Sequence, residues 1–159
     1  MNTISKFSRW LCLITLIISG SVLASDRTVL AFTNNGQTQH WTLSEMIDKA
    51  DMNVITKTPW TDGLVTFRGV SSRHLLALVD KPKADIKVTA LNDYWAVIPY
   101  EDIVKYNPIF AVMQNEQTMS IRDKGPIWVI YPLTQHNELN NEVLHSRMVW
   151  QVASIELQP

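Results

Sequence analysis

Cysteine is nearly absent from this sequence of 159 residues, which contains only Cys12. That residue lies in an apolar run close to the N-terminus, within a segment whose pattern marks it for removal. A mature chain without a thiol has no disulfide, no thiolate ligand for a metal and no cysteine nucleophile. Its stability therefore has to come from the packing of a hydrophobic core.

The familiar signatures of nucleotide-binding and hydrolytic enzymes are also missing. The sequence has only five glycines and contains no GxGxxG, no glycine-rich phosphate loop, no GxSxG and no HExxH. Its 14 basic and 15 acidic residues nearly balance, and no cluster of lysine or arginine occurs. Nucleic acid binding depends on such a cluster, so we expect no nucleic acid partner.

The first 24 residues have the three-part pattern of a secretory signal peptide. Lys6 and Arg9 precede an apolar run over 11–18, and small residues lead to Ala24, after which we expect cleavage. The alternative is a retained anchor, but the apolar run is shorter than the ~20 residues that span a bilayer. We expect no membrane span after cleavage. Residues 25–159 then form a single exported domain, periplasmic or secreted, of ordinary size for one core.

Apolar and β-branched runs recur along the mature sequence, with turn residues between them. We predict short strands at 28–33, 37–41, 54–56, 64–67, 86–91, 94–98, 109–113, 118–121, 127–131 and 148–157. Helical spacing predicts three short helices, at 43–49, 72–79 and 99–106. Thr42 and Glu45 have the spacing of a capping box for the first of them. These elements predict an α+β fold with a mixed or antiparallel sheet and short helices.

The stretch 122–132 joins a charged turn to a short apolar strand, and it is the first candidate for a binding site. Lys124 and Gly125 favour a turn, whereas Trp128 lies among the aromatic and β-branched residues of a buried strand. A scaffold can use such a turn only to reverse the chain. Alternatively, exposed Arg122 and Lys124, held beside Trp128, face a ligand or a partner.

Other polar and aromatic residues also have two explanations. Trp60, in a turn after Pro59, is either a rim aromatic of a ligand site or a structural plug. Glu101 and Asp102 fall in the first turn of a predicted helix, where the helix dipole explains two carboxylates without acid–base chemistry. We assign no catalytic or metal-binding residue. The one-turn spacing of a helical metal pair is missing, so we expect surface positions for His74, His136 and His145.

Four groups of short motifs follow one another: Phe67-Arg68-Gly69-Val70 with Leu75-Leu76, Ala90-Leu91-Asn92-Asp93-Tyr94 leading to Ile98-Pro99, Met119 with Gly125-Pro126 and Ile130-Tyr131-Pro132, and Ile155-Glu156-Leu157. In this order they resemble the molybdopterin-binding domain of the sulfite oxidase family, over roughly 54–157. The resemblance implies a mixed α+β fold and a molybdenum–pterin cofactor in a pocket that these motifs surround. We expect Gly69 at a tight strand exit, where valine costs roughly 1–3 kcal/mol.

The sequence departs from this family where the cofactor is bound. Family enzymes ligate molybdenum through a cysteine, whereas the corresponding segment 54–63 offers threonine, lysine, proline and tryptophan. The family's Gly-x-Pro segment typically has a preceding His and a following Arg, which suit a phosphate group. Here Lys124 precedes Gly125, and Trp128 lies near the position of that Arg. We therefore expect no cofactor, although molybdopterin is the one that the resemblance implies.

Three functions are compatible with the sequence. The first is a non-catalytic exported domain that uses the former pocket to bind a small molecule or a periplasmic or membrane sensor protein. The second is a molybdopterin-dependent oxidoreductase whose metal ligand is not cysteine. The third is a structural or assembly accessory whose pocket is collapsed and filled by Trp128. For the first, the candidate binding residues are Trp60, Arg68, Asn92, Asp93, Tyr94, Trp95, Arg122, Lys124 and Trp128.

Overall fold

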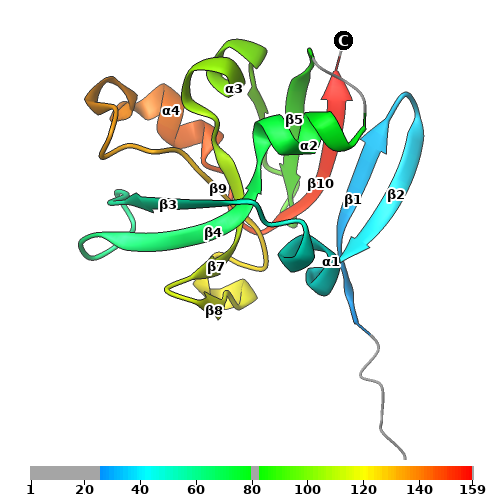
Figure 1. Cartoon of the computed structure of the whole chain (residues 1–159), viewed down its shortest axis with the longest axis horizontal. Coiled ribbons are helices and arrows are strands. Elements are labelled where there is room, and N and C mark those ends of the chain that lie inside the picture. The colour runs from blue at the N-terminus through cyan, green and yellow to red at the C-terminus, as the bar shows by residue number, and fades with distance from the viewer. Residues whose placement is uncertain (1–25, 80–82, 159) are drawn as a thin grey trace, which may run out of the picture.

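A computed structural model describes residues 26–79 and 83–158 of the chain. The predicted signal peptide at 1–24, including Cys12, lies outside the described residues. The described residues form two β-sheets connected by short helices (Figure 1). This confirms the predicted α+β class and its mixed, mainly antiparallel sheet structure.

The first sheet combines strands from both ends of the domain. Its strand order is β2 (Gln37–Thr42), β1 (Thr28–Asn34), β10 (Val152–Gln158), β5 (Asp85–Ala90) and β6 (Trp95–Ile98). β1 is parallel to β10, and the other neighbours are antiparallel. The β1–β2 turn contains Asn35 and Gly36 at φ values of 50° and 77°, the left-handed backbone that a tight hairpin turn requires.

The second sheet is built around a central strand near the middle of the chain. Its order is β3 (Met52–Thr56), β4 (Val65–Ser71), β7 (Ile109–Gln114) and β8 (Gln117–Thr118), and β9 (Trp128–Ile130) also pairs with β7. Every one of these pairings is antiparallel. In Figure 1, β3 and β4 run roughly horizontally, whereas β1, β5 and β10 run roughly vertically. The strands of the two sheets therefore cross rather than align.

Short helical segments connect the strands: α1 (Leu43–Asp48), α2 (Ser72–Leu78), α3 (Tyr100–Tyr106), η1 (Ile121–Asp123), η2 (Asn137–Leu139) and α4 (Glu142–Arg147). The predicted capping box of α1 is confirmed. The Thr42 hydroxyl accepts the N–H of Glu45 over 3.2 Å, and the Glu45 carboxylate accepts the N–H of Thr42 over 2.7 Å. The Thr42 N–H and the Thr42 hydroxyl both donate to the Glu45 carboxylate, and these two hydrogen bonds to its charged form lower the pKa of Glu45.

The apolar run from Ile127 to Tyr131 is buried, as its composition predicts. Trp128 is only 1% exposed, and its indole N–H donates to the carbonyl of Met148 over 3.1 Å. Its ring meets that of Phe67 edge to face, with 5.4 Å between the centroids. Trp128 is thus a core residue with a satisfied polar group. This corrects the expectation that its ring faces a ligand.

Three local assignments differ from the prediction. Gly69 lies inside β4, where the strand continues to Ser71, rather than at a strand exit. The last strand begins at Val152, because Gln151 has a φ of 52° that interrupts the extended backbone before it. Residues 132–147, for which no strand or helix is predicted, contain η2 and α4. The last two differences both alter the candidate site.

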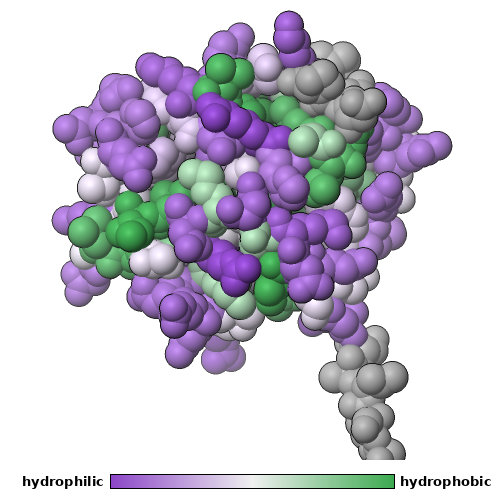
Figure 2. Space-filling model, viewed as in Figure 1, coloured by the Kyte–Doolittle hydropathy of each residue, from purple (hydrophilic) through white to green (hydrophobic). Residues whose placement is uncertain are grey.

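Some hydrophobic side chains remain at the surface. Figure 2 shows a hydrophobic patch over β3 and β4, and Ile55 and Leu64 from this region are more than half exposed.

Among residues 26–79 and 83–158, no helix has the length and apolar character needed to cross a bilayer.

Candidate functional site

A tight turn after β3 positions Trp60. The N–H of Thr58 donates to the hydroxyl of Thr61 over 2.9 Å, and the N–H of Trp60 donates to the hydroxyl of Thr58 over 3.2 Å. Thr58 is buried, so these bonds fix the turn against the domain. These hydrogen bonds therefore fix the position of the turn from which the Trp60 indole extends.

Helix α4 and the segment that follows it lie near Trp60. Asn141 caps the helix, because its side-chain oxygen accepts the N–H of Leu144 over 3.1 Å. The hydroxyl of Tyr94, just before β6, donates to the carbonyl of Ser146 over 2.8 Å. This bond ties the β5–β6 hairpin to α4. Three segments that are distant in sequence thus converge on one place.

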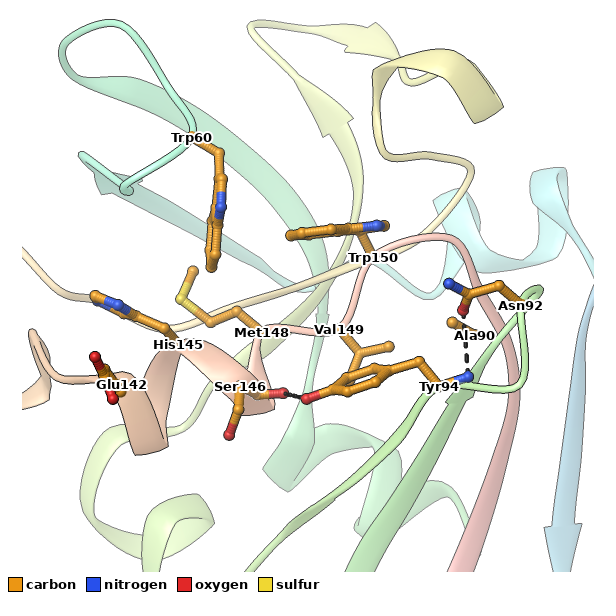
Figure 3. Close-up of a pocket in the computed structure, with 10 residues that line it drawn as sticks. All are labelled: Trp60, Ala90, Asn92, Tyr94, Glu142, His145, Ser146, Met148, Val149 and Trp150. Carbon is orange, nitrogen blue, oxygen red and sulfur yellow. Dashed lines mark hydrogen bonds between the residues drawn. The ribbon is translucent and has the colours of Figure 1, made fainter.

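These segments enclose a cavity of about 410 Å³, called here the aromatic cavity. Most of its wall is apolar or aromatic and comes from Trp60, Ala90, Tyr94, Met148, Val149 and Trp150. The polar lining residues are Asn92, Glu142, His145 and Ser146. The rings of Trp60 and Trp150 meet edge to face, with 5.2 Å between centroids and 80° between planes (Figure 3). The cavity therefore offers two indole surfaces at a right-angled corner.

The aromatic cavity is backed by the hydrophobic core. The ring of Trp60 is 6.1 Å from the ring of buried Trp128. The ammonium group of Lys124 lies 5.5 Å from the ring centre of Trp128 and 6.0 Å from that of Trp150. Lys124 is thus beside Trp128, as the sequence predicts, and it stabilises the cluster by cation–π contacts of about 0.5–1 kcal/mol each.

A buried carboxylate connects α4 to α3. Oδ2 of Asp102 accepts the hydroxyl of Tyr131 over 2.8 Å and the guanidinium of Arg147 over 2.6 Å. Hydrogen bonds to a charged acceptor are stronger than neutral ones. Asp102 therefore does more than complement the helix dipole, which was the explanation drawn from its sequence position. It holds the end of α4 that leads into the cavity wall.

Tyr131 gives this network a dependence on alkaline pH. Burial, followed by the neighbouring Asp102 charge, raises the pKa of Tyr131 far above its usual value of 10.0. The folded chain keeps the phenol proton where the unfolded chain releases it, so the free energy of unfolding should fall as pH rises above about 10. Tyr131→Phe should remove this part of the slope and cost about 1 kcal/mol at neutral pH. Urea unfolding at several pH values measures both effects.

The matched control is Tyr100→Phe, which removes the hydroxyl of a partly exposed tyrosine that makes no hydrogen bond through this hydroxyl within the described residues. This variant should keep the alkaline slope of the original protein. An unchanged slope in Tyr131→Phe would show that another group causes the loss of stability.

A second concavity of about 750 Å³, called here the polar hollow, lies next to the aromatic cavity. His145 lines both, and Trp60 directly follows Pro59, which lines the hollow. The hydroxyl of Thr134 accepts the N–H of Lys57 over 3.0 Å and so joins two walls of the hollow. Its polar lining residues are Lys57, Thr58, Thr134, Asn137, Asn140 and His145.

The structure brings only some of the predicted binding residues together. Three of them line the aromatic cavity: Trp60, Asn92 and Tyr94. Asp93 is exposed in the hairpin turn beside them. Trp95 is 58% exposed, and the ammonium of Lys87 lies over its ring at 5.7 Å. Arg68 and Arg122 are exposed and line neither concavity.

Sequence patterns did not point to the residues that α4 and its following segment contribute. Met148 and Trp150 fit the alternation of the strand predicted at 148–157. For His145 the sequence predicts only a surface position. The signal for α4 is Asn141 directly before Glu142, a helix N-cap followed by an acidic first turn.

Comparisons with protein-family models and with curated proteins find no match for this chain. The site is therefore interpreted from its own chemistry.

The side chains at the site do not fit the molybdenum–pterin cofactor that the resemblance implies. The segment 54–63, where the metal ligand would lie, supplies hydroxyl, ammonium and indole groups but no thiolate. Besides the phenol of Tyr94, the ionisable groups that line the aromatic cavity are Glu142 and His145. A carboxylate there opposes the phosphate of a pterin cofactor.

Proposed function

We propose that this chain is an exported, non-catalytic binding protein that holds a small, flat and largely apolar molecule in the aromatic cavity. The observation that carries this proposal is the corner formed by Trp60 and Trp150, with Tyr94 nearby. Ligand pockets are typically about 300–1,000 Å³, mostly apolar, with a few polar groups that fix orientation. The aromatic cavity has that size and composition.

A flat ligand suits this geometry. One indole of a perpendicular pair can stack on the face of a ligand ring while the other meets the ligand at its edge, and both arrangements are favourable for aromatic systems. Figure 3 shows Trp60, Trp150 and Tyr94 around the same space, with the thioether of Met148 next to the Trp60 ring. A thioether adapts to irregular shapes and contacts aromatic rings well. The wall therefore favours ring-containing molecules over extended polar ones.

The polar groups of the cavity support binding rather than catalysis. A serine nucleophile needs a base within hydrogen-bond reach. The hydroxyl of Ser146 donates instead to the carbonyl of Val143 over 2.7 Å, and Nε2 of His145 bonds to Oδ1 of Asn140 over 3.0 Å. These two neighbouring residues are thus engaged separately, and neither activates the other.

The proposal includes export and a sulfite oxidase-like scaffold, which are supported by the leader at 1–24 and by the order of motifs over 54–157. Burial of Trp128 favours a structural role for that residue, but the open cavity beside it favours binding over a collapsed accessory domain. Stoichiometric molybdenum in the protein purified from its exported compartment would contradict the non-catalytic proposal.

Binding of the neutral fluorescent dye N-phenylnaphthylamine tests the aromatic cavity. The dye should bind the unaltered protein with increased fluorescence, and Trp150→Ala should weaken its affinity about tenfold, because a stacking surface is lost. Trp95→Ala is the matched control, since it removes an exposed indole that does not line the cavity. Absence of dye binding, or equal affinity in both variants, would contradict the proposed site.

A further inference from the structure

The polar hollow differs in charge from the aromatic cavity beside it. Among the described residues, the only ionisable groups that line it are the ammonium of Lys57 and the imidazole of His145, and none of these lining residues carries a carboxylate. In the aromatic cavity the charged lining residue is an acid, Glu142. One concavity thus favours apolar rings, and its neighbour favours negative charge.

Lys57 is available to a ligand. Its side chain has no ion-pair partner within residues 26–79 and 83–158, and the residue is exposed. Its backbone is fixed, because its N–H donates to the hydroxyl of Thr134 over 3.0 Å. Thr134 in turn donates its own N–H to Thr56 over 3.1 Å. The ammonium therefore extends from an anchored position at the end of β3.

Two side-chain amides add hydrogen-bond donors to the same hollow. The amide nitrogens of Asn137 and Asn140 make no hydrogen bond to the described part of the chain. The amide oxygen of Asn140 is already engaged with His145. Its nitrogen can thus donate to a ligand. An ammonium with two amide donors can satisfy several oxygen atoms of one acidic group.

His145 joins the two concavities, because it lines both of them. Its ring packs on Trp60 with 5.8 Å between the centroids. Trp60 lines the aromatic cavity, and Pro59 before it lines the polar hollow. A molecule seated against Trp60 is therefore next to the hollow, and a flexible extension of it can reach Lys57.

From this arrangement we infer that the polar hollow is the anionic subsite of the binding site. The ligand then consists of a flat apolar group joined to an acidic head group, such as a carboxylate, sulfonate or phosphate. This inference rests on the proposed function, because it assigns the second part of the same ligand.

The test uses a dansyl-labelled undecanoic acid and its methyl ester, which differ in the charge of the head group and by one methyl group. The dansyl ring is flat and aromatic, like the ligand proposed for the aromatic cavity, and the flexible chain lets the carboxylate reach the hollow over a range of distances. A charge-assisted hydrogen bond is worth ~1.5–3 kcal/mol, so the acid should bind at least about tenfold more tightly than the ester. Lys57→Gln should remove this preference and leave ester affinity unchanged.

Lys49→Gln is the matched control, because it removes the same charge from the residue directly after α1, where Lys49 lies over Trp41 and lines neither concavity. Equal affinity of acid and ester for the unaltered protein would overturn the anionic subsite, as would an acid preference that survives Lys57→Gln. In either case the ester still binds, and the aromatic cavity is retained as the site. Failure of both dyes to bind would overturn the proposed function together with this inference.

Discussion

Gly69→Ala should destabilise the protein by about 3 kcal/mol or more, and valine at this position should do so by more than alanine. A Cβ atom at Gly69 would lie 2.1 Å from the carbonyl oxygen of Phe110 and 2.6 Å from Cα of Ala111. Both obstacles are backbone atoms of β7, the central strand of the second sheet, so no side-chain rotation relieves the overlap. The sheet itself would have to move.

Gly63→Ala separates this effect from the general cost of replacing a glycine. A Cβ atom there meets nothing within 4 Å, but the residue has a φ of 75°, so alanine should cost about 1 kcal/mol through backbone strain alone. Urea unfolding of both variants gives the comparison. If Gly69→Ala and Gly63→Ala lost equal stability, the backbones of β4 and β7 would be farther apart at Gly69 than the structure shows.

The main strands and helices of the fold were predictable because local chemistry and tertiary structure agree there. The turn at Asn35 and Gly36, the capping box of Thr42 and Glu45, and the apolar run before Tyr131 each use a short sequence signal. The position of Gly69 illustrates the limit. A side chain cannot fit at Gly69 because β7, a strand some forty residues later in the sequence, lies directly against it. No local sequence pattern indicates that β7 packs so closely there.

The candidate site was predictable only in part, for a similar reason. Trp60 was identified because an aromatic residue in a turn is conspicuous in a sequence, and Tyr94 because it belongs to one of the motifs that carry the family resemblance. Trp150 was missed because its segment has the alternation of a strand, and the positive φ of Gln151 that ends this pattern has no clear sequence signal. The burial of Trp128 agrees with the predicted strand, but its additional choice as a binding residue was wrong, because composition alone does not distinguish a core indole from one at a pocket.

Arg147→Met is the second substitution from which we expect a large effect. It removes the charged partner of Asp102 and leaves that carboxylate with one hydrogen bond, from Tyr131. Breaking a fully buried ion pair costs about 3–5 kcal/mol. Here the side chains of Arg147 and Asp102 are 24% and 13% exposed, so solvent screens the remaining charge and about 2–3 kcal/mol is expected. Urea unfolding at neutral pH measures the loss.

A double variant distinguishes an unpaired charge from lost packing. Combining Asp102→Asn with Arg147→Met removes the charge, and the new amide still accepts the Tyr131 hydroxyl, so the double variant should be more stable than Arg147→Met alone. Arg122→Met, at an exposed site, should change stability by less than about 0.5 kcal/mol. If Arg147→Met behaves like Arg122→Met, the Asp102 network does not anchor α4. If Arg147→Met is destabilised as expected, it should also bind N-phenylnaphthylamine more weakly, because Ser146 and Met148 on either side of the anchor line the aromatic cavity.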